Sequence, residues 1–272
     1  MSHESGDRRG YELPSTYQNL QDLWRGHYDH FNEVLKQFLV TSYQETDGGL
    51  VFLEVGAGTR SVLMRGLQET LNEEDCPDTL LVHFVDSEPL DQIQPAGWED
   101  SALVADCQNS SEGVFELLNN DQEISWKFIQ EDFMKFLKGP DRYDFILLHG
   151  VLHEIFKYSG VEAEDFFPDF FIRLAGLLQP RGKILIADTY YPLYLSEEQI
   201  DQMIEWQREV INHADPPEAF VHPEQILKLL LLNAKVASRL ELVFEEQRRY
   251  RARLPESSVA RKFYTLGLGL TT

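Results

Sequence analysis

The sequence predicts an α/β protein: a doubly wound, Rossmann-like, mainly parallel sheet with an antiparallel C-terminal edge strand and a helical cap and lid. Three observations predict this fold class. Short apolar runs alternate with longer segments of helical periodicity, the first such run leads into a glycine-rich turn, and the alternation stops after residue 188. Strands that are apolar throughout and separated by helices indicate a parallel sheet buried on both faces.

The elements of the core follow in chain order. Residues 1–13 are expected to form a flexible tail, and from Tyr17 to Tyr43 apolar residues recur every three or four positions, which indicates a helical cap. The expected strands are Leu50–Val55, Leu80–Val85, Trp126–Ile129, Tyr143–His149 and Lys183–Asp188. The helices expected between them are Ser61–Asn72, Glu112–Asn119, Asp132–Leu137 and Asp165–Leu178.

The rhythm changes in the C-terminal third. Two lid helices are expected at Glu197–Asn212 and Pro223–Leu232, followed by strands Arg239–Glu245 and Lys262–Leu268, which would pair antiparallel at the sheet edge. We therefore expect one domain over residues 14–272. It would comprise a cap at 14–46, a core at 50–190, lid helices within 191–235 and C-terminal strands within 236–272.

The composition excludes several classes of partner. The 272 residues carry 24 Lys and Arg against 46 Asp and Glu, a formal net charge of −22. Such a chain repels a nucleic-acid backbone and an anionic membrane surface. No apolar run approaches the ~20 residues that cross a bilayer, and two cysteines are too few for a disulfide framework or a thiolate metal site. We expect a cytoplasmic protein, monomeric or homodimeric, that binds neither nucleic acid nor membrane.

A glycine-rich turn, within FLEVGAGTRS at residues 52–61, follows the first expected strand. In an open parallel sheet this turn borders the ligand crevice, and glycine lets the backbone turn sharply. The third glycine of a dinucleotide fingerprint is replaced by Ser61, and Glu54 would repel a pyrophosphate. Both features disfavour a nucleotide-linked dehydrogenase, whereas Glu54 suits a cationic ligand. The alternative is that Gly56 and Gly58 only form a tight turn.

The second expected strand ends in a carboxylate, Asp86, at the position where such folds hold ribose hydroxyls. Asp86 lies further from the glycines than the usual ~20 residues, because an extra polar segment precedes its strand. The connection at residues 89–124 is also long. This length makes Asp106 a competing candidate for a contact with the ligand.

Together these motifs resemble those of the class I S-adenosylmethionine-dependent methyltransferases. EVGAGT looks like their first motif, VDS at Val85–Ser87 like their second, Glu131-Asp132-Phe133 like their acidic adenine-side motif, and LLQPRGKILIADTY like the approach to their fifth strand. The resemblance covers about residues 50–190 and implies S-adenosylmethionine as cofactor. The cofactor-binding residues that it implies, with the further candidates, are Glu54, Gly56, Ala57, Gly58, Asp86, Ser87, Asp132, Phe133 and His149, then Asp106, Tyr17 and Tyr28.

Two histidines follow the fourth core strand. His149 ends that strand, and His153 would share a face with it if a helix began at once. Imidazole serves as a general base near neutral pH or as a metal ligand, and we expect no metal because the pair would need further ligands. His153-Glu154 is similar to the segment of plant-type O-methyltransferases whose histidine deprotonates a hydroxyl. The resemblance makes His153 the candidate base, with His149 nearer the cofactor; for His153, structural hydrogen bonding is the open alternative.

Aromatic residues mark the expected acceptor pocket. They follow the fifth strand or lie in the lid, and they are Tyr190, Tyr191, Trp206, Phe220 and His222. An aromatic pocket favours a small organic molecule. The expected function is methyl transfer to such an acceptor, with oxygen slightly favoured over nitrogen or carbon. The alternative from another class is a catalytically silent S-adenosylmethionine-binding subunit that activates a partner.

Overall fold

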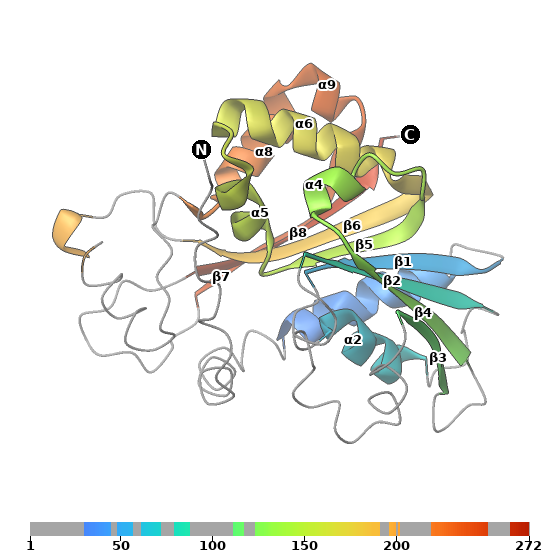
Figure 1. Cartoon of the computed structure of the whole chain (residues 1–272). Coiled ribbons are helices and arrows are strands. Elements are labelled where there is room, and N and C mark those ends of the chain that lie inside the picture. Colours follow the sequence, from blue (N-terminus) through green and yellow to red (C-terminus); the bar gives the residue numbers. More distant parts are fainter. Residues whose placement is uncertain are drawn as a thin grey trace.

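A twisted sheet of eight strands, in the order β3-β4-β2-β1-β5-β6-β8-β7, forms the centre of the computed structural model (Figure 1). The structure describes residues 30–44, 48–56, 61–71, 79–87, 111–116, 123–190, 196–199, 201, 219–249 and 262–271. The strands are β1 (Leu50–Val55), β2 (Leu80–Asp86), β3 (Glu112–Glu116), β4 (Glu123–Gln130), β5 (Tyr143–His149), β6 (Leu178–Tyr190), β7 (Leu240–Arg249) and β8 (Lys262–Leu270).

The middle of the sheet is parallel and its edges are antiparallel. Strands β4, β2, β1, β5 and β6 run in one direction. At one edge β3 is antiparallel to β4, and at the other β8 lies antiparallel between β6 and β7. The predicted fold class is confirmed, including the C-terminal antiparallel pair.

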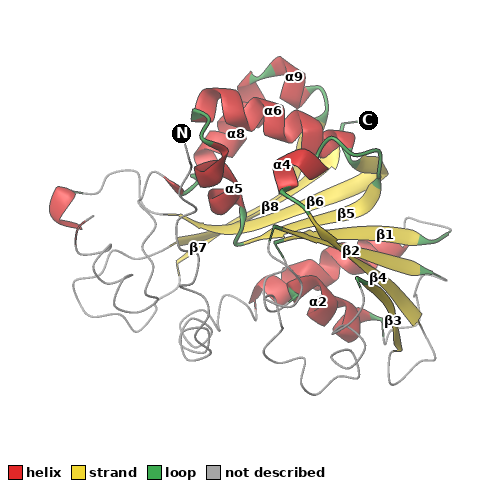
Figure 2. Cartoon of the chain, viewed as in Figure 1, coloured by secondary structure: helices red, strands yellow, loops and turns green. Residues whose placement is uncertain are grey.

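Helices cover both faces of the sheet (Figure 2). They are the helix at residues 30–44, α2 (Val62–Thr70), α4 (Phe133–Phe136), α5 (Leu152–Ser159), α6 (Ala163–Gly176), α8 (Pro223–Leu232) and α9 (Ala234–Ala237). The helix at 30–44 and α2 lie on one face, and the other helices lie on the opposite face (Figure 1). No helix in the described part of the chain is both long and apolar enough to span a bilayer.

The two faces carry separate hydrophobic cores, which explains why the central strands are apolar at consecutive positions. On β1, Phe52 packs with the helix at 30–44 and α2, whereas its neighbour Leu53 packs with the helices of the other face. Both side chains are fully buried. The same alternation along β5 and β6 fixes the register of the middle strands.

One predicted element is wrong. The segment predicted as a helix at Glu112–Asn119 contains β3, which pairs with β4 over Glu112–Glu116. Tertiary pairing decides here, because the backbone groups of this edge segment find partners on β4. Gly113 sits directly against Trp126, and a Cβ at Gly113 would lie 2.7 Å from the indole Nε1.

Other boundaries differ by a few residues. Helix α6 begins at Ala163 and ends at Gly176, so Leu178, predicted as helical, instead begins β6. Most of the lid helix predicted at Glu197–Asn212 lies outside the described residues, as does most of the cap before residue 30. Helix α8 has the predicted bounds; His222 accepts from the Glu224 N–H and the Gln225 side chain accepts from the His222 N–H, which caps the helix.

Candidate functional site

The chain reverses its direction of progress across the sheet between β1 and β5. From β1 it proceeds to β2 on one side, whereas from β5 it proceeds to β6 on the other. In open α/β sheets the ligand crevice lies outside the carboxyl ends of the strands at such a point. The residues that follow β1 and β5 therefore border the candidate site.

A left-handed glycine stands directly after each of these two strands. Gly56 has φ +65° and Gly150 has φ +67°. The Gly56 N–H donates to the Val85 carbonyl at 2.8 Å, and the Gly150 N–H donates to the Ala187 carbonyl at 2.7 Å. The segments that follow β1 and β5 are thus each held to a neighbouring strand while the backbone turns away from the sheet.

The two glycines differ in their surroundings. A Cβ at Gly56 would lie 2.6 Å from Cγ2 of Val151, whereas a Cβ at Gly150 would meet no described residue within 4 Å. Packing and backbone conformation together therefore require glycine at position 56. At Gly150, no described residue stands between the backbone and the crevice. Gly150 was not among the site residues predicted from the sequence; its position directly after a buried strand was the available signal.

Glu54 organises the start of α2. Its buried carboxylate accepts hydrogen bonds from the Ser61 hydroxyl and from the backbone N–H groups of Val62, at 2.9 Å, and Leu63, at 3.4 Å. Burial raises the pKa of Glu54 to about 7, and these three hydrogen bonds oppose the shift. Ser61, at the replaced glycine position, also caps the helix by accepting from the Met64 N–H at 2.9 Å.

The second strand brings Asp86 to the same edge of the sheet. Asp86 is the last residue of β2 and is partly exposed, and Ser87 follows it at the surface. The Asp86 carbonyl accepts from the Glu131 N–H at 2.9 Å, so the ends of β2 and β4 are joined there. Asp86 therefore lies at the carboxyl end of the sheet, beside the crevice.

The acidic motif after β4 divides its side chains between surface and core. Asp132 is exposed and caps α4 by accepting from the Lys135 N–H at 3.2 Å. Phe133 is buried and stacks on Phe136, with ring centroids 6.0 Å apart. Asp132 thus lies just after the carboxyl end of β4, whereas the Phe133 ring contributes to the core.

His149 and His153 lie on different elements and contact different aromatic side chains. His149 is the last residue of β5, and α5 begins only at Leu152, so the expected four-residue spacing on one helix face is wrong. The His149 ring lies 4.6 Å from the Phe31 ring, centroid to centroid. Burial lowers the pKa of His149 to about 4, so this imidazole is neutral at pH 7.

His153, in the first turn of α5, forms a buried pair with Asp188 of β6. Its Nδ1 lies 2.9 Å from Asp188 Oδ1 and its backbone N–H donates to Oδ2 at 3.1 Å. The Thr189 N–H donates to Oδ1 of the same carboxylate at 2.7 Å. The His153 contacts and the Thr189 hydrogen bond lower the pKa of Asp188 against the opposing effect of burial, so Asp188 stays ionised near neutrality.

Aromatic rings surround the His153–Asp188 pair. Phe220 stacks on the His153 imidazole, with ring centroids 4.8 Å apart and planes within 13°. Tyr190, two residues after Asp188, meets the His222 ring edge to face at 4.7 Å. Three of the predicted pocket residues thus gather around the carboxyl end of β6.

The remaining predicted site residues lie outside the part of the chain that the structure describes: Ala57, Gly58, Asp106, Tyr17, Tyr28, Tyr191 and Trp206. Among those that are described, no group of three or more His, Cys, Asp or Glu side chains is arranged to hold a metal ion.

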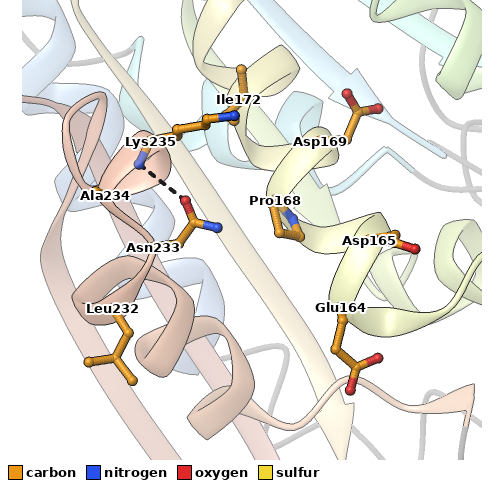
Figure 3. Close-up of a pocket in the computed structure, with 9 residues that line it drawn as sticks. All are labelled: Glu164, Asp165, Pro168, Asp169, Ile172, Leu232, Asn233, Ala234 and Lys235. Carbon is orange, nitrogen blue, oxygen red and sulfur yellow. Dashed lines mark hydrogen bonds between the residues drawn. The ribbon is translucent and has the colours of Figure 1, made fainter.

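A surface groove lies away from these residues, between α6 and the turn from α8 to α9 (Figure 3). One wall carries Glu164, Asp165 and Asp169, and the other carries Leu232 and Lys235. No residue predicted for the cofactor or the acceptor lines it. The groove is therefore separate from the crevice at the strand ends.

Comparison with solved structures identifies the fold. The cyclopropane synthase MmaA2 from Mycobacterium tuberculosis superposes with a TM-score of 0.50 at 12% identity, over 84% of this chain and 81% of that one. The plantazolicin methyltransferase BpumL, in complex with SAH, gives 0.48 at 14% identity, over 95% and 92%. No family model and no curated protein matches the sequence. The chain has a Rossmann-like α/β fold similar to that of the cyclopropane synthase.

Proposed function

We propose that this chain is an S-adenosylmethionine-dependent methyltransferase that acts on a small organic acceptor, with an oxygen as the favoured methylated atom. The observation that carries the proposal is the buried His153–Asp188 pair at the carboxyl end of β6, beside the crevice between β1 and β5. The fold and the motifs after β1 and β2 support the choice of cofactor.

The residues at the crevice fit that cofactor. Among the described residues, none approaches the Cβ position of Gly150 after β5, and the Asp86 carboxylate at the end of β2 suits a pair of ribose hydroxyls. His149 is neutral and partly apolar, so it does not repel a cationic sulfonium. We assign Gly56, Asp86, Asp132 and His149 to cofactor binding, and Glu54 to holding the start of α2 beneath it.

When bound, S-adenosylmethionine supplies an activated methyl group, so the protein has chiefly to align the acceptor and remove its proton. Asp188 engages Nδ1 of His153, which fixes the ring and directs Nε2 to the other side of the imidazole. Nε2 accepts the proton of the acceptor hydroxyl, and the ionised Asp188 stabilises the resulting imidazolium. A base of this kind is required by a hydroxyl acceptor, which is why oxygen is favoured.

Calorimetry with S-adenosylmethionine and with NADH tests the cofactor. We expect binding of the first and not of the second; binding of NADH alone would favour a dehydrogenase. Incubating the isolated chain with labelled S-adenosylmethionine and a library of small phenols and alcohols then tests turnover. Binding without transfer to any acceptor would favour the silent-subunit alternative.

His153→Ala tests the base. We expect the variant to keep the affinity for S-adenosylmethionine and to lose about 100-fold or more in kcat, the usual contribution of a general base. His83→Gln is the matched control, because His83 is also a buried histidine but bonds to Tyr143 at the opposite end of β5. A His153→Ala variant with full rate would remove this residue as the base.

A further inference from the structure

Tyr264 of β8 lies directly beside the His153–Asp188 pair. It is the cross-strand partner of Asp188 in the antiparallel ladder between β6 and β8. Opposite residues of such a ladder project from the same face of the sheet. Tyr264 packs in the hydrophobic core that also contains Leu152 of α5, the helix that carries His153.

The Tyr264 hydroxyl is buried and has no hydrogen-bond partner among the residues that the structure describes. The side chain as a whole is only 1% exposed. A buried polar group left unsatisfied costs about 1–3 kcal/mol, so native proteins keep few of them. The neighbouring tyrosine shows the ordinary solution, since the Tyr190 hydroxyl donates to Gln247 Oε1 at 2.8 Å.

We propose that Tyr264 binds the acceptor: its hydroxyl forms a hydrogen bond with a second oxygen of the molecule whose first oxygen faces His153. This inference rests on the proposed function, because it assigns a role within the acceptor site. The residue determines specificity and takes no part in proton transfer.

The surroundings define the chemistry of that second oxygen. Burial and the charge of Asp188 hold the pKa of Tyr264 far above its usual value, so the phenol is neutral and both donates and accepts. Because Asp188 is ionised and close by, a carboxylate or phosphate beside Tyr264 would be repelled. The acceptor class is therefore a compound with two neutral oxygens, such as a diol, a dihydroxyarene or a hydroxycarbonyl compound.

Tyr264→Phe tests the proposal, with Tyr143→Phe as the matched control. The Tyr143 hydroxyl has a partner, His83, at 2.9 Å, and lies at the amino end of β5. Without ligand, we expect Tyr264→Phe to unfold at the same temperature as the wild type or higher, and Tyr143→Phe to unfold lower. Loss of stability in Tyr264→Phe would show that the hydroxyl is already satisfied within the protein and would overturn the proposal.

The ligand arm uses catechol, resorcinol and phenol as probes, with binding measured by calorimetry on the full chain. We expect the wild type and Tyr143→Phe to prefer at least one dihydroxybenzene over phenol by about tenfold, and Tyr264→Phe to lose that preference. A wild type without any preference, or a preference that survives in Tyr264→Phe, would overturn the proposal. Methyl transfer is assayed separately, so a preference without transfer would refute the proposed function alone.

Discussion

The Asp188 carboxylate holds His153 at two points, through Nδ1 at 2.9 Å and through the backbone N–H at 3.1 Å. The first contact sets the orientation of the imidazole, and the second fixes the start of α5 against β6. A single buried carboxylate thereby ties the candidate base to β6. Orientation of this kind is what a general base needs in addition to a suitable pKa.

Asp188→Asn should separate charge from shape. The amide is nearly isosteric but does not stabilise an imidazolium, and its NH₂ group can force the other His153 tautomer. We expect kcat to fall by about 100-fold or more and cofactor affinity to stay unchanged. The measurement is a steady-state assay paired with calorimetry. Equal losses in kcat and cofactor affinity would instead indicate that Asp188 only supports the fold.

The stability of the protein should respond to Glu54. Its pKa is raised from 4.5 to about 7 in the folded state, so the folded state binds a proton more tightly than the unfolded state. The Glu54 contribution is therefore favourable below pH 4.5 and is lost as the pH rises to about 7, by at most about 1.4 kcal/mol per pH unit. Measured by urea unfolding across this range, the free energy of unfolding of the wild type relative to that of Glu54→Gln should fall as the pH rises. Parallel curves for the two proteins would refute the assignment.

His149 should act in the opposite direction. Its pKa is lowered from 6.5 to about 4, so between these values the unfolded state binds more protons at this site and the His149 contribution to stability rises with pH. His149→Gln should remove this rise while leaving the Glu54 slope in place. Denaturant titrations at pH 4.5, 5.5 and 6.5 provide the comparison, and a difference in free energy of unfolding between the wild type and His149→Gln that stays constant with pH would count against it.

The two left-handed glycines should tolerate alanine unequally. Gly150→Ala meets no neighbour among the described residues and should lose only the left-handed backbone preference, about 1–2 kcal/mol. Gly56→Ala adds a clash with Val151 and should lose more. Combining Gly56→Ala with Val151→Ala should relieve the clash and recover the stability lost to it. The stability lost to the left-handed backbone conformation should not be recovered. Equal losses in the two single variants, measured by urea unfolding, would contradict this account.

Several features could be predicted from local sequence. The strands Leu50–Val55 and Tyr143–His149 have the predicted bounds, because apolar residues at consecutive positions specify a strand buried on both faces. Helix α8 also has the predicted bounds, with Pro223 at its first position. Glu112–Glu116 was misassigned because an edge strand depends on pairing with β4, a long-range contact that local periodicity does not contain.

The sequence by itself determined the fold class, the glycine turn after β1, the carboxylate that ends β2 and the histidines after β5. Each of these follows from residue type and spacing along one segment. Only the tertiary structure decided the roles of the side chains. It joined Asp188 to His153 across 35 residues, used Glu54 to start α2, and left the Tyr264 hydroxyl buried beside them. The physical reason is that hydrogen bonding and burial depend on which segments meet across the sheet.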